Sequence, residues 1–196
     1  LTNGVITVKS VTVNSISVND KDYDGTTTAT QKSVIALSGV INGDIVTATA
    51  SKYAFASSAA GTGKTVTATG ITLSGTDSGN YELSSTQATT TANINKVKVT
   101  PTVTANSKVY DGTNNGTGKV TLTGAVNNEK PEASATFKFE DQSGFVGNNK
   151  TVNVSNITLT GSWGTNYELT TTTDTTTANI TKATLTATYT SETVFF

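Results

Sequence analysis

The segment 57–70, SSAAGTGKTVTATG, contains the residues that most resemble a chemical site. Gly63–Thr65 matches the end of a phosphate-binding loop, which also needs a glycine five positions earlier and a helix immediately afterwards. Ser58 occupies the position of that glycine, and the alternating residues that follow predict a strand. A similar segment later in the chain keeps Lys150–Thr151 but has Asn149 before them. We therefore interpret GKT as a turn that leads into a strand.

A second candidate site is a group of carboxylates near the amino-terminal end. Asp20, Asp22 and Asp24 have the spacing of the first half of a calcium-binding loop, and a glycine follows them. Gln31 stands where such a loop has its closing acid, and the similar segment later in the chain keeps only Asp111. The aspartates therefore indicate either calcium in the first copy or a turn, in which Asp binds nearby amides and Gly adopts positive φ.

Three further residue types could also carry chemistry. Glu82 and Glu168 could act as paired carboxylates in glycoside hydrolysis, but they are equivalent positions of a repeat, so we do not expect a catalytic pair. Asn93 and Asn179 could form isopeptide bonds with lysine, but each lies between two apolar residues and should face water. Trp163 is the single tryptophan and could stack on a sugar or pack inside the protein.

The composition excludes several classes of function. The 196 residues include no His, Cys or Met, which removes the usual general base, the thiolate nucleophile and the common zinc ligands. All 13 basic residues are lysine and the net charge is −1, so we expect no nucleic-acid binding. No stretch is apolar enough to span a membrane, so we expect no membrane insertion. The start at Leu1 indicates a piece of a longer protein.

The sequence contains two copies of one repeat, and each copy is as long as a whole domain. Three sequence matches define the repeat: YDGT at 23–26 and 110–113, NYEL at 80–83 and 166–169, and TTTANI at 89–94 and 175–180. The final segment resembles the opening of the second repeat. We therefore predict domains at 1–95 and 96–182, followed at 183–196 by the leading strand of a truncated third repeat. The joint contains no Gly/Ser linker, so we expect a short and stiff connection.

The elements that position these residues are short strands. Alternation of Val, Ile and aromatic residues predicts about seven strands in each repeat and no helices. The segments 34–40 and 44–50 flank Asn42-Gly43 and predict a hairpin. Alternation changes phase near Gly70 and again near Asn156, which predicts a bulge at the same place in both repeats. The phase also slips within 5–18, which predicts a kinked first strand.

Tyrosines mark the structural positions of each repeat. The segment TDSGNYEL resembles the tyrosine corner of immunoglobulin-like sandwiches, although a plain core tyrosine explains it too. We therefore predict tandem immunoglobulin-like β-sandwich domains. The residues to which we assign structural roles are Tyr23, Asp24, Gly25, Tyr81, Tyr110, Asp111, Gly112 and Tyr167.

Taken together, the segments KDYDGTTTAT, LSGVINGD, GTGKTV, LSGTDSGNYEL and TTTANI resemble the YDG-type repeats of large bacterial surface proteins, including filamentous-haemagglutinin-like adhesins. The resemblance covers nearly the whole chain, and the second repeat departs from it only in apparent turns. It implies secreted, extracellular β-domains in an adhesin at the bacterial cell surface, and it implies no ligand.

We expect the chain to be a non-enzymatic stalk or spacer in cell adhesion. A host glycan or protein would then be bound by other parts of the parent protein, and the fragment would be a monomer without a cofactor. The alternative is a module that binds a glycan or a host protein through loops near Trp163 or Asp20–Asp24.

Overall fold

The computed structural model of the chain describes residues 4 and 6–189. Strands dominate these residues, and their helical elements are the two 3-10 turns η1 (Ser78–Asn80) and η2 (Trp163–Thr165). The predicted all-β class is therefore confirmed. The chain divides into two compact units. Unit 1 contains Leu1–Val97 with Ala125–Glu129 and Thr165–Glu168, and unit 2 contains Lys98–Gly124, Lys130–Gly164 and Leu169–Phe196.

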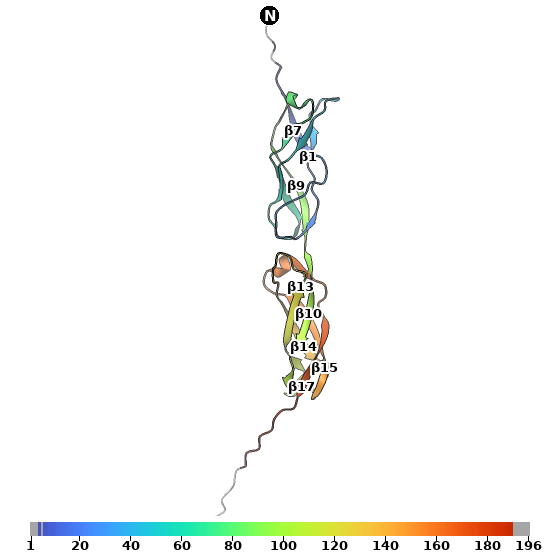
Figure 1. Cartoon of the computed structure of the whole chain (residues 1–196), viewed down its shortest axis with the longest axis vertical. Helices are drawn as coiled ribbons and strands as arrows, with labels where there is room; N and C mark the ends of the chain where they lie inside the picture. Colours follow the sequence, from blue (N-terminus) through green and yellow to red (C-terminus); the bar gives the residue numbers. More distant parts are fainter. Residues whose placement is uncertain (1–3, 5, 190–196) are drawn as a thin grey trace, which may run out of the picture. The chain divides into compact units, whose positions relative to one another are not determined.

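Unit 1 contains three small sheets, with strand orders β3-β1-β8, β2-β9-β6-β5 and β4-β7. Most neighbours are antiparallel, whereas β1 pairs with β8 and β2 pairs with β9 in parallel. Figure 1 labels β1, β7 and β9 of this unit. Its strands are β1 (Lys9–Ser15), β2 (Lys21–Asp22), β3 (Ala36–Ser38), β4 (Thr47–Thr49), β5 (Lys52–Phe55), β6 (Gly61–Thr69), β7 (Thr72–Ser74), β8 (Tyr81–Leu83) and β9 (Gln87–Asn95).

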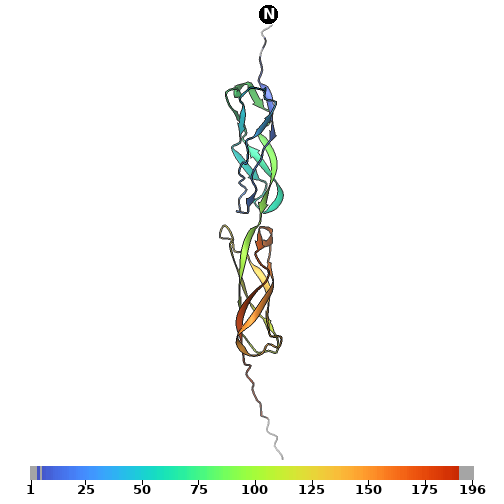
Figure 2. The same ribbon diagram turned by 90° about the vertical axis from the view of Figure 1, so that its right-hand side faces the viewer.

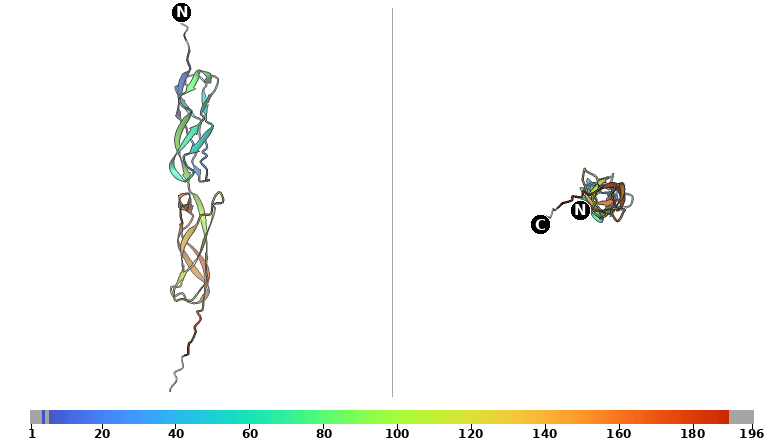
Figure 3. Two further views of the ribbon diagram at one scale, coloured as in Figure 1. Left: turned by 90° about the vertical axis from the view of Figure 1, so that its left-hand side faces the viewer. Right: turned by 90° about the horizontal axis from the view of Figure 1, so that it is seen from below.

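The second repeat contains two sheets, with orders β13-β10-β16 and β11-β17-β15-β14-β12. The long strands β15 and β17 pair antiparallel and twist together, as the orange and red ribbons of Figure 2 show. The left panel of Figure 3 gives the view from the side opposite to that of Figure 2. The strands are β10 (Val97–Ala105), β11 (Lys108–Val109), β12 (Asn115–Gly116), β13 (Gly118–Thr123), β14 (Ala133–Phe139), β15 (Gly147–Leu159), β16 (Tyr167–Leu169) and β17 (Asp174–Thr181).

Alternate residues of these strands form the cores. Val99 and Val103 of β10 are buried, and the threonines between them are exposed, because successive side chains of a strand point to opposite faces. One cluster of buried side chains fills unit 2: Val103, Phe137, Phe139, Val152, Val154, Ile157, Ala178 and Ile180. The few apolar residues of the sequence thus lie mainly on the buried face of each strand, and threonine residues lie mainly on the exposed face.

Both predicted phase breaks are confirmed as irregularities of the backbone. Gly70 and Asn156 have positive φ angles of 62° and 54°, and the register of β14 against β15 shifts between Ser134 and Thr136. Next to these positions Ile71 and Ile157 lie in the core, with 1% and 0% of their surface exposed. The first strand also has a register shift, between Val13 and Ser15, so the predicted kink in 5–18 is confirmed for the described part.

The hairpin predicted around Asn42-Gly43 is wrong. A turn is present, with a hydrogen bond from the amide of Asp44 to the carbonyl of Ile41. Its flanking strands belong to different sheets, however, because β3 pairs with β1 whereas β4 pairs with β7. The chain therefore passes from one sheet to another at this turn.

The interpretation of GKT as a turn is also wrong. Gly63–Thr65 lies inside β6, where the pairing with β9 shifts register between Gly61 and Lys64. The equivalent shift in β15 falls between Gly147 and Lys150. GKT therefore marks a bulge within a long strand, and no helix follows it that could present amides to a phosphate.

The segment predicted as the leading strand of a third repeat is described up to residue 189. Residues 182–189 contain no strand, and the side chains of Leu185 and Tyr189 are 96% and 92% exposed. Residues 190–196 lie outside the described residues, so the third repeat stays a prediction. In the described part of the chain, no helix has the length and apolar character that crossing a bilayer requires.

Candidate functional site

The YDG turn of the first repeat is held together by one carboxylate. Asp24 Oδ1 accepts hydrogen bonds from the backbone amide and the hydroxyl of Thr26, at 2.8 and 2.9 Å. Lys21 Nζ lies 2.7 Å from the same oxygen and also donates to the carbonyl of Thr26. Gly25 has a φ of 76°, a conformation that glycine adopts without steric cost. This is an Asx turn closed by a lysine.

The second repeat builds the same turn. Asp111 Oδ1 accepts the amide and hydroxyl of Thr113 at 2.9 and 3.0 Å, and Lys108 Nζ lies 2.6 Å away. The hydrogen bonds from Lys108 and Thr113 lower the pKa of Asp111 to about 2. In the first repeat, burial opposes ionisation, but Lys21 and Thr26 outweigh it and lower the pKa of Asp24. Both carboxylates therefore stay charged in solutions of moderate acidity.

The sequence did not lead us to predict the lysine of this turn, although the repeated motif that contains it is visible there. Lys21 and Lys108 stand at the same place in KDYDGT and KVYDGT, three residues before the aspartate. Their side chains are only 18% and 16% exposed. Each ammonium group lies over an aromatic ring, 5.7 Å from Phe55 and 5.9 Å from Phe139.

Each repeat also pairs a tyrosine with an acid. The Tyr81 hydroxyl accepts the amide of Ile41 at 3.1 Å and donates to Asp44 at 2.5 Å. The hydrogen bond to Asp44 and burial raise the pKa of Tyr81. A tyrosine corner binds backbone a few residues upstream, whereas this hydroxyl reaches a loop 40 residues upstream.

The second repeat repeats this pairing. Tyr167 accepts the amide of Val126 at 3.3 Å and donates to Glu129 at 2.6 Å. Burial, followed by the hydrogen bond to Glu129, raises the pKa of Tyr167 to about 12. The sequence did not predict that Asp44 and Glu129 bind these tyrosines, because the loop that carries each acid is far from the tyrosine in sequence.

The candidate isopeptide residues instead hold the strand bulges. Asn93 Oδ1 accepts the amide of Gly63 at 2.8 Å, and Asn179 Oδ1 accepts that of Asn149 at the same distance. Their neighbours Ala92 and Ile94 are buried, as are the equivalent residues of the second repeat, so the asparagines point away from the core as expected. In this geometry the side-chain amides of Asn93 and Asn179 have a structural role, because they bind the backbone at the bulges.

The three aspartates of the candidate calcium loop do not converge. Asp20 accepts the backbone amide and side-chain amide of Asn93, at 2.7 and 3.0 Å. Asp22 accepts the side chain of Asn95 at 3.1 Å, and Asp24 closes its own turn. Among residues 4 and 6–189, no three acidic side chains are grouped closely enough to hold a metal ion.

The other candidates lie at separate places. Glu82 and Glu168 are exposed, and each follows the buried tyrosine of its strand, β8 or β16. Trp163 begins η2 and is half-buried. The structure brings neither glutamate into a cluster of acids.

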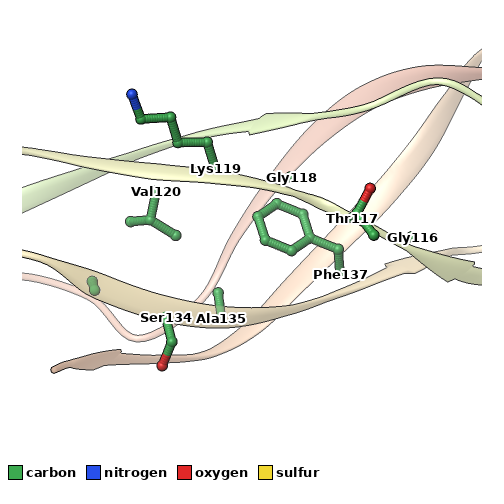
Figure 4. Close-up of a pocket in the computed structure, with 9 residues that line it drawn as sticks. Gly116, Thr117, Gly118, Lys119, Val120, Ser134, Ala135 and Phe137 are labelled. Carbon is green, nitrogen blue, oxygen red and sulfur yellow. The ribbon is translucent and has the colours of Figure 1, made fainter.

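A depression of about 420 Å³ opens between β13 and β14 in unit 2. In Figure 4, Val120 and Phe137 point into it from the two strands, whereas the side chains of Lys119 and Ser134 point away. A ligand site normally adds polar groups that fix orientation, and the depression instead resembles an apolar gap between two neighbouring sheets.

Comparison with known families identifies the repeat. The model of the YDG domain matches residues 7–92 and again residues 94–178. No curated protein and no solved structure matches the chain. Both matches include the Lys-x-Tyr-Asp-Gly-Thr turn and the tyrosine–acid pair described above. Because the two matches cover most of its length, the chain belongs to the YDG domain family.

Proposed function

We propose that the chain is a non-enzymatic stalk or spacer formed by tandem repeats, in an adhesin at the surface of a bacterial cell. The proposal includes an extracellular location and an immunoglobulin-like arrangement of the layered sheets. It is supported by the duplication of whole domains, each of which matches the YDG domain. It is also supported by the sequence motifs of both repeats, which resemble those of repeats in bacterial surface proteins.

One observation carries the proposal: the polar residues that both repeats share hydrogen-bond to the protein's own loops and strands. The lysine and aspartate of each YDG turn close that turn. The tyrosine–acid pairs tie a strand to a loop, and the asparagines fix a bulge. Duplication of a catalytic or binding site would preserve groups directed at a ligand, whereas duplication of scaffolding preserves groups directed at the fold.

The test is a binding screen of the whole chain against arrays of glycans and host surface proteins. A spacer gives no saturable binding, and its stretching by force spectroscopy gives two separate unfolding events, one for each repeat. Saturable binding would overturn the spacer proposal in favour of a binding module. Quenching of Trp163 fluorescence by a sugar, lost in Trp163→Phe, would place that module's site at η2. Hydrolysis of a substrate would overturn the non-enzymatic proposal.

A further inference from the structure

The YDG turn of the first repeat contacts two other segments of unit 1. The Tyr23 hydroxyl donates to Glu129 Oε1 at 2.8 Å, and its ring stands edge-on to Tyr167, with centroids 5.7 Å apart. Asn127 Nδ2 donates to the carbonyl of Asp24 at 2.6 Å. Tyr23 is only 7% exposed as a result. The segments 125–129 and 165–168 thus form a receptor for a YDG turn within unit 1.

Glu129 is the centre of this receptor. Its Oε1 accepts the hydroxyl of Tyr23, and its Oε2 accepts the hydroxyl of Tyr167. One carboxylate therefore bridges two phenols, one from the turn and one from the receptor. Hydrogen bonds to a charged acceptor are stronger than those between neutral groups, which makes this bridge the most directional part of the contact.

The receptor residues occur a second time, in the first repeat. The sequence VNNE at 126–129 corresponds to INGD at 41–44, and Tyr167 corresponds to Tyr81. Asp44 Oδ2 accepts the Tyr81 hydroxyl, as Glu129 Oε2 accepts that of Tyr167. The described residues donate no hydrogen bond to the other oxygen, Asp44 Oδ1. This oxygen corresponds to the one that binds Tyr23 in the receptor at Glu129.

The surface around Asp44 is open and partly apolar. Ile41 is 56% exposed, whereas its counterpart Val126 is half-buried. A depression of about 380 Å³ adjoins it, lined among others by Ile6, Val8, Asn80 and Tyr81. It therefore has room for an inserted side chain beside an acceptor that the described residues leave unused.

The matching turn also occurs a second time, in the second repeat. Tyr110–Gly112 has the same internal hydrogen bonds as Tyr23–Gly25. Tyr110 is 39% exposed, compared with 7% for Tyr23. No described residue forms a hydrogen bond with its hydroxyl. Within residues 4 and 6–189, one YDG turn and one receptor thus have no partner for these hydrogen bonds.

We propose that the receptor at Ile41, Asn42, Asp44 and Tyr81 binds the Tyr110–Gly112 turn of a second copy of this chain, head to tail. The Tyr110 hydroxyl donates to Asp44 Oδ1, its ring stands edge-on to Tyr81, and Asn42 donates to the carbonyl of Asp111. Such an interface is heterologous, because it joins the receptor of one copy to the turn of another. A dimer therefore still has one unoccupied receptor and one unoccupied turn, and association continues into larger assemblies. One turn is a small contact, so the association is weak and depends on concentration.

The experiment is sedimentation velocity of the whole chain over a range of concentrations up to about 1 mM, at which an association with a dissociation constant of about 1 mM is populated. The wild-type mass rises with concentration. Ile41→Lys blocks the receptor and Tyr110→Ala blocks the turn, so each variant alone remains a monomer. Ile41→Lys keeps an intact turn, and Tyr110→Ala keeps an intact receptor. An equimolar mixture of the two variants therefore forms dimers and no larger species. Tyr110→Phe lowers the association constant about tenfold, because it removes a hydrogen bond to a charged acceptor.

Ile45→Lys is the matched control. Ile45 is 61% exposed, and its counterpart in the other receptor is already a lysine, Lys130. This variant associates as the wild type does, and circular dichroism verifies that all variants are folded. A wild-type chain that stays monomeric up to about 1 mM overturns the proposal. Unchanged association of folded Ile41→Lys or Tyr110→Ala also overturns it, because the contact would then lie elsewhere.

Discussion

Tyr167 donates a hydrogen bond to Glu129, with 2.6 Å between the phenol oxygen and Oε2. Tyr81 and Asp44 form the same pair in the first repeat. The acid differs in length, but the loop that carries it and the strand that carries the tyrosine are the same. The pair therefore belongs to the architecture of the repeat, and its effects are measurable through the titration of the phenol.

Alkaline pH should weaken the fold through Tyr167. Its pKa rises from 10.0 to about 12, first because of burial and then because of the bond to Glu129. A group whose pKa is raised by folding contributes stability below its unfolded pKa, and that contribution is lost as pH rises through the folded pKa. We expect the free energy of unfolding to fall between pH 10.0 and about 12. Urea denaturation at each pH measures it.

Two variants check the assignment of this alkaline transition. Tyr167→Phe should remove one tyrosine from the absorbance step near pH 12, and Glu129→Gln should shift that step to lower pH while the ring stays buried. An unchanged step in both variants would contradict the prediction.

Acid should weaken the YDG turn of the second repeat. The pKa of Asp111 falls from 3.8 to about 2, chiefly through its hydrogen bond with Lys108. A depressed pKa contributes stability above the unfolded value, and that stability is lost as pH falls through the folded value. The free energy of unfolding should therefore decrease from pH 3.8 to about 2. Denaturation followed by fluorescence of Trp163, the single tryptophan, monitors unit 2.

Lys108→Met tests the cause of this acid sensitivity. It keeps an apolar stem against Phe139 but removes the ammonium group, so the pKa of Asp111 should move back towards 3.8 in an NMR carboxyl titration. Glu82→Gln is the control, because Glu82 is exposed and lies in unit 1. A pKa of Asp111 that stays near 2 in Lys108→Met would show that the lysine is not responsible.

The bulge at Asn149 should discriminate between residue types. Its φ is 50°, a conformation that glycine and asparagine adopt more readily than other residues. Asn149→Ala should destabilise unit 2 by about 1 kcal/mol, whereas Asn149→Gly, which copies Gly63 of the first repeat, should cost less. Asn153→Ala, in the middle of the same strand, is the control. Equal effects of Ala and Gly at position 149 would disprove the backbone explanation.

Tyr53→Phe should stabilise unit 1. The Tyr53 side chain is 8% exposed, and its hydroxyl is buried without a hydrogen-bond partner among the described residues. Removing a buried unsatisfied group should raise the free energy of unfolding by about 1 kcal/mol. The second repeat already has Phe137 at the equivalent place, two residues before the phenylalanine that lies under the lysine. Chemical denaturation followed by circular dichroism measures the change, and a loss of stability would refute the prediction.

The strand content and the bulges could be predicted from the sequence because both depend on local alternation. A side chain of a strand points to one of two faces, so the phase breaks at Gly70 and Asn156 are visible without any tertiary information. The Asx turn at Asp24 was predictable for the same reason, since its partners are two residues away. Lys21 was missed as part of this turn, although its repetition as Lys108 was there to be compared.

The sequence by itself determined that this chain is all-β, duplicated and without histidine or cysteine chemistry, because composition, repetition and alternation do not depend on which strands pair. Only the tertiary structure decided that β3 and β4 join different sheets, that GKT is a bulge, and that Tyr81 bonds to Asp44. These features depend on which strands become neighbours. That choice is made by burying apolar faces from distant segments together, and no short stretch of sequence contains it.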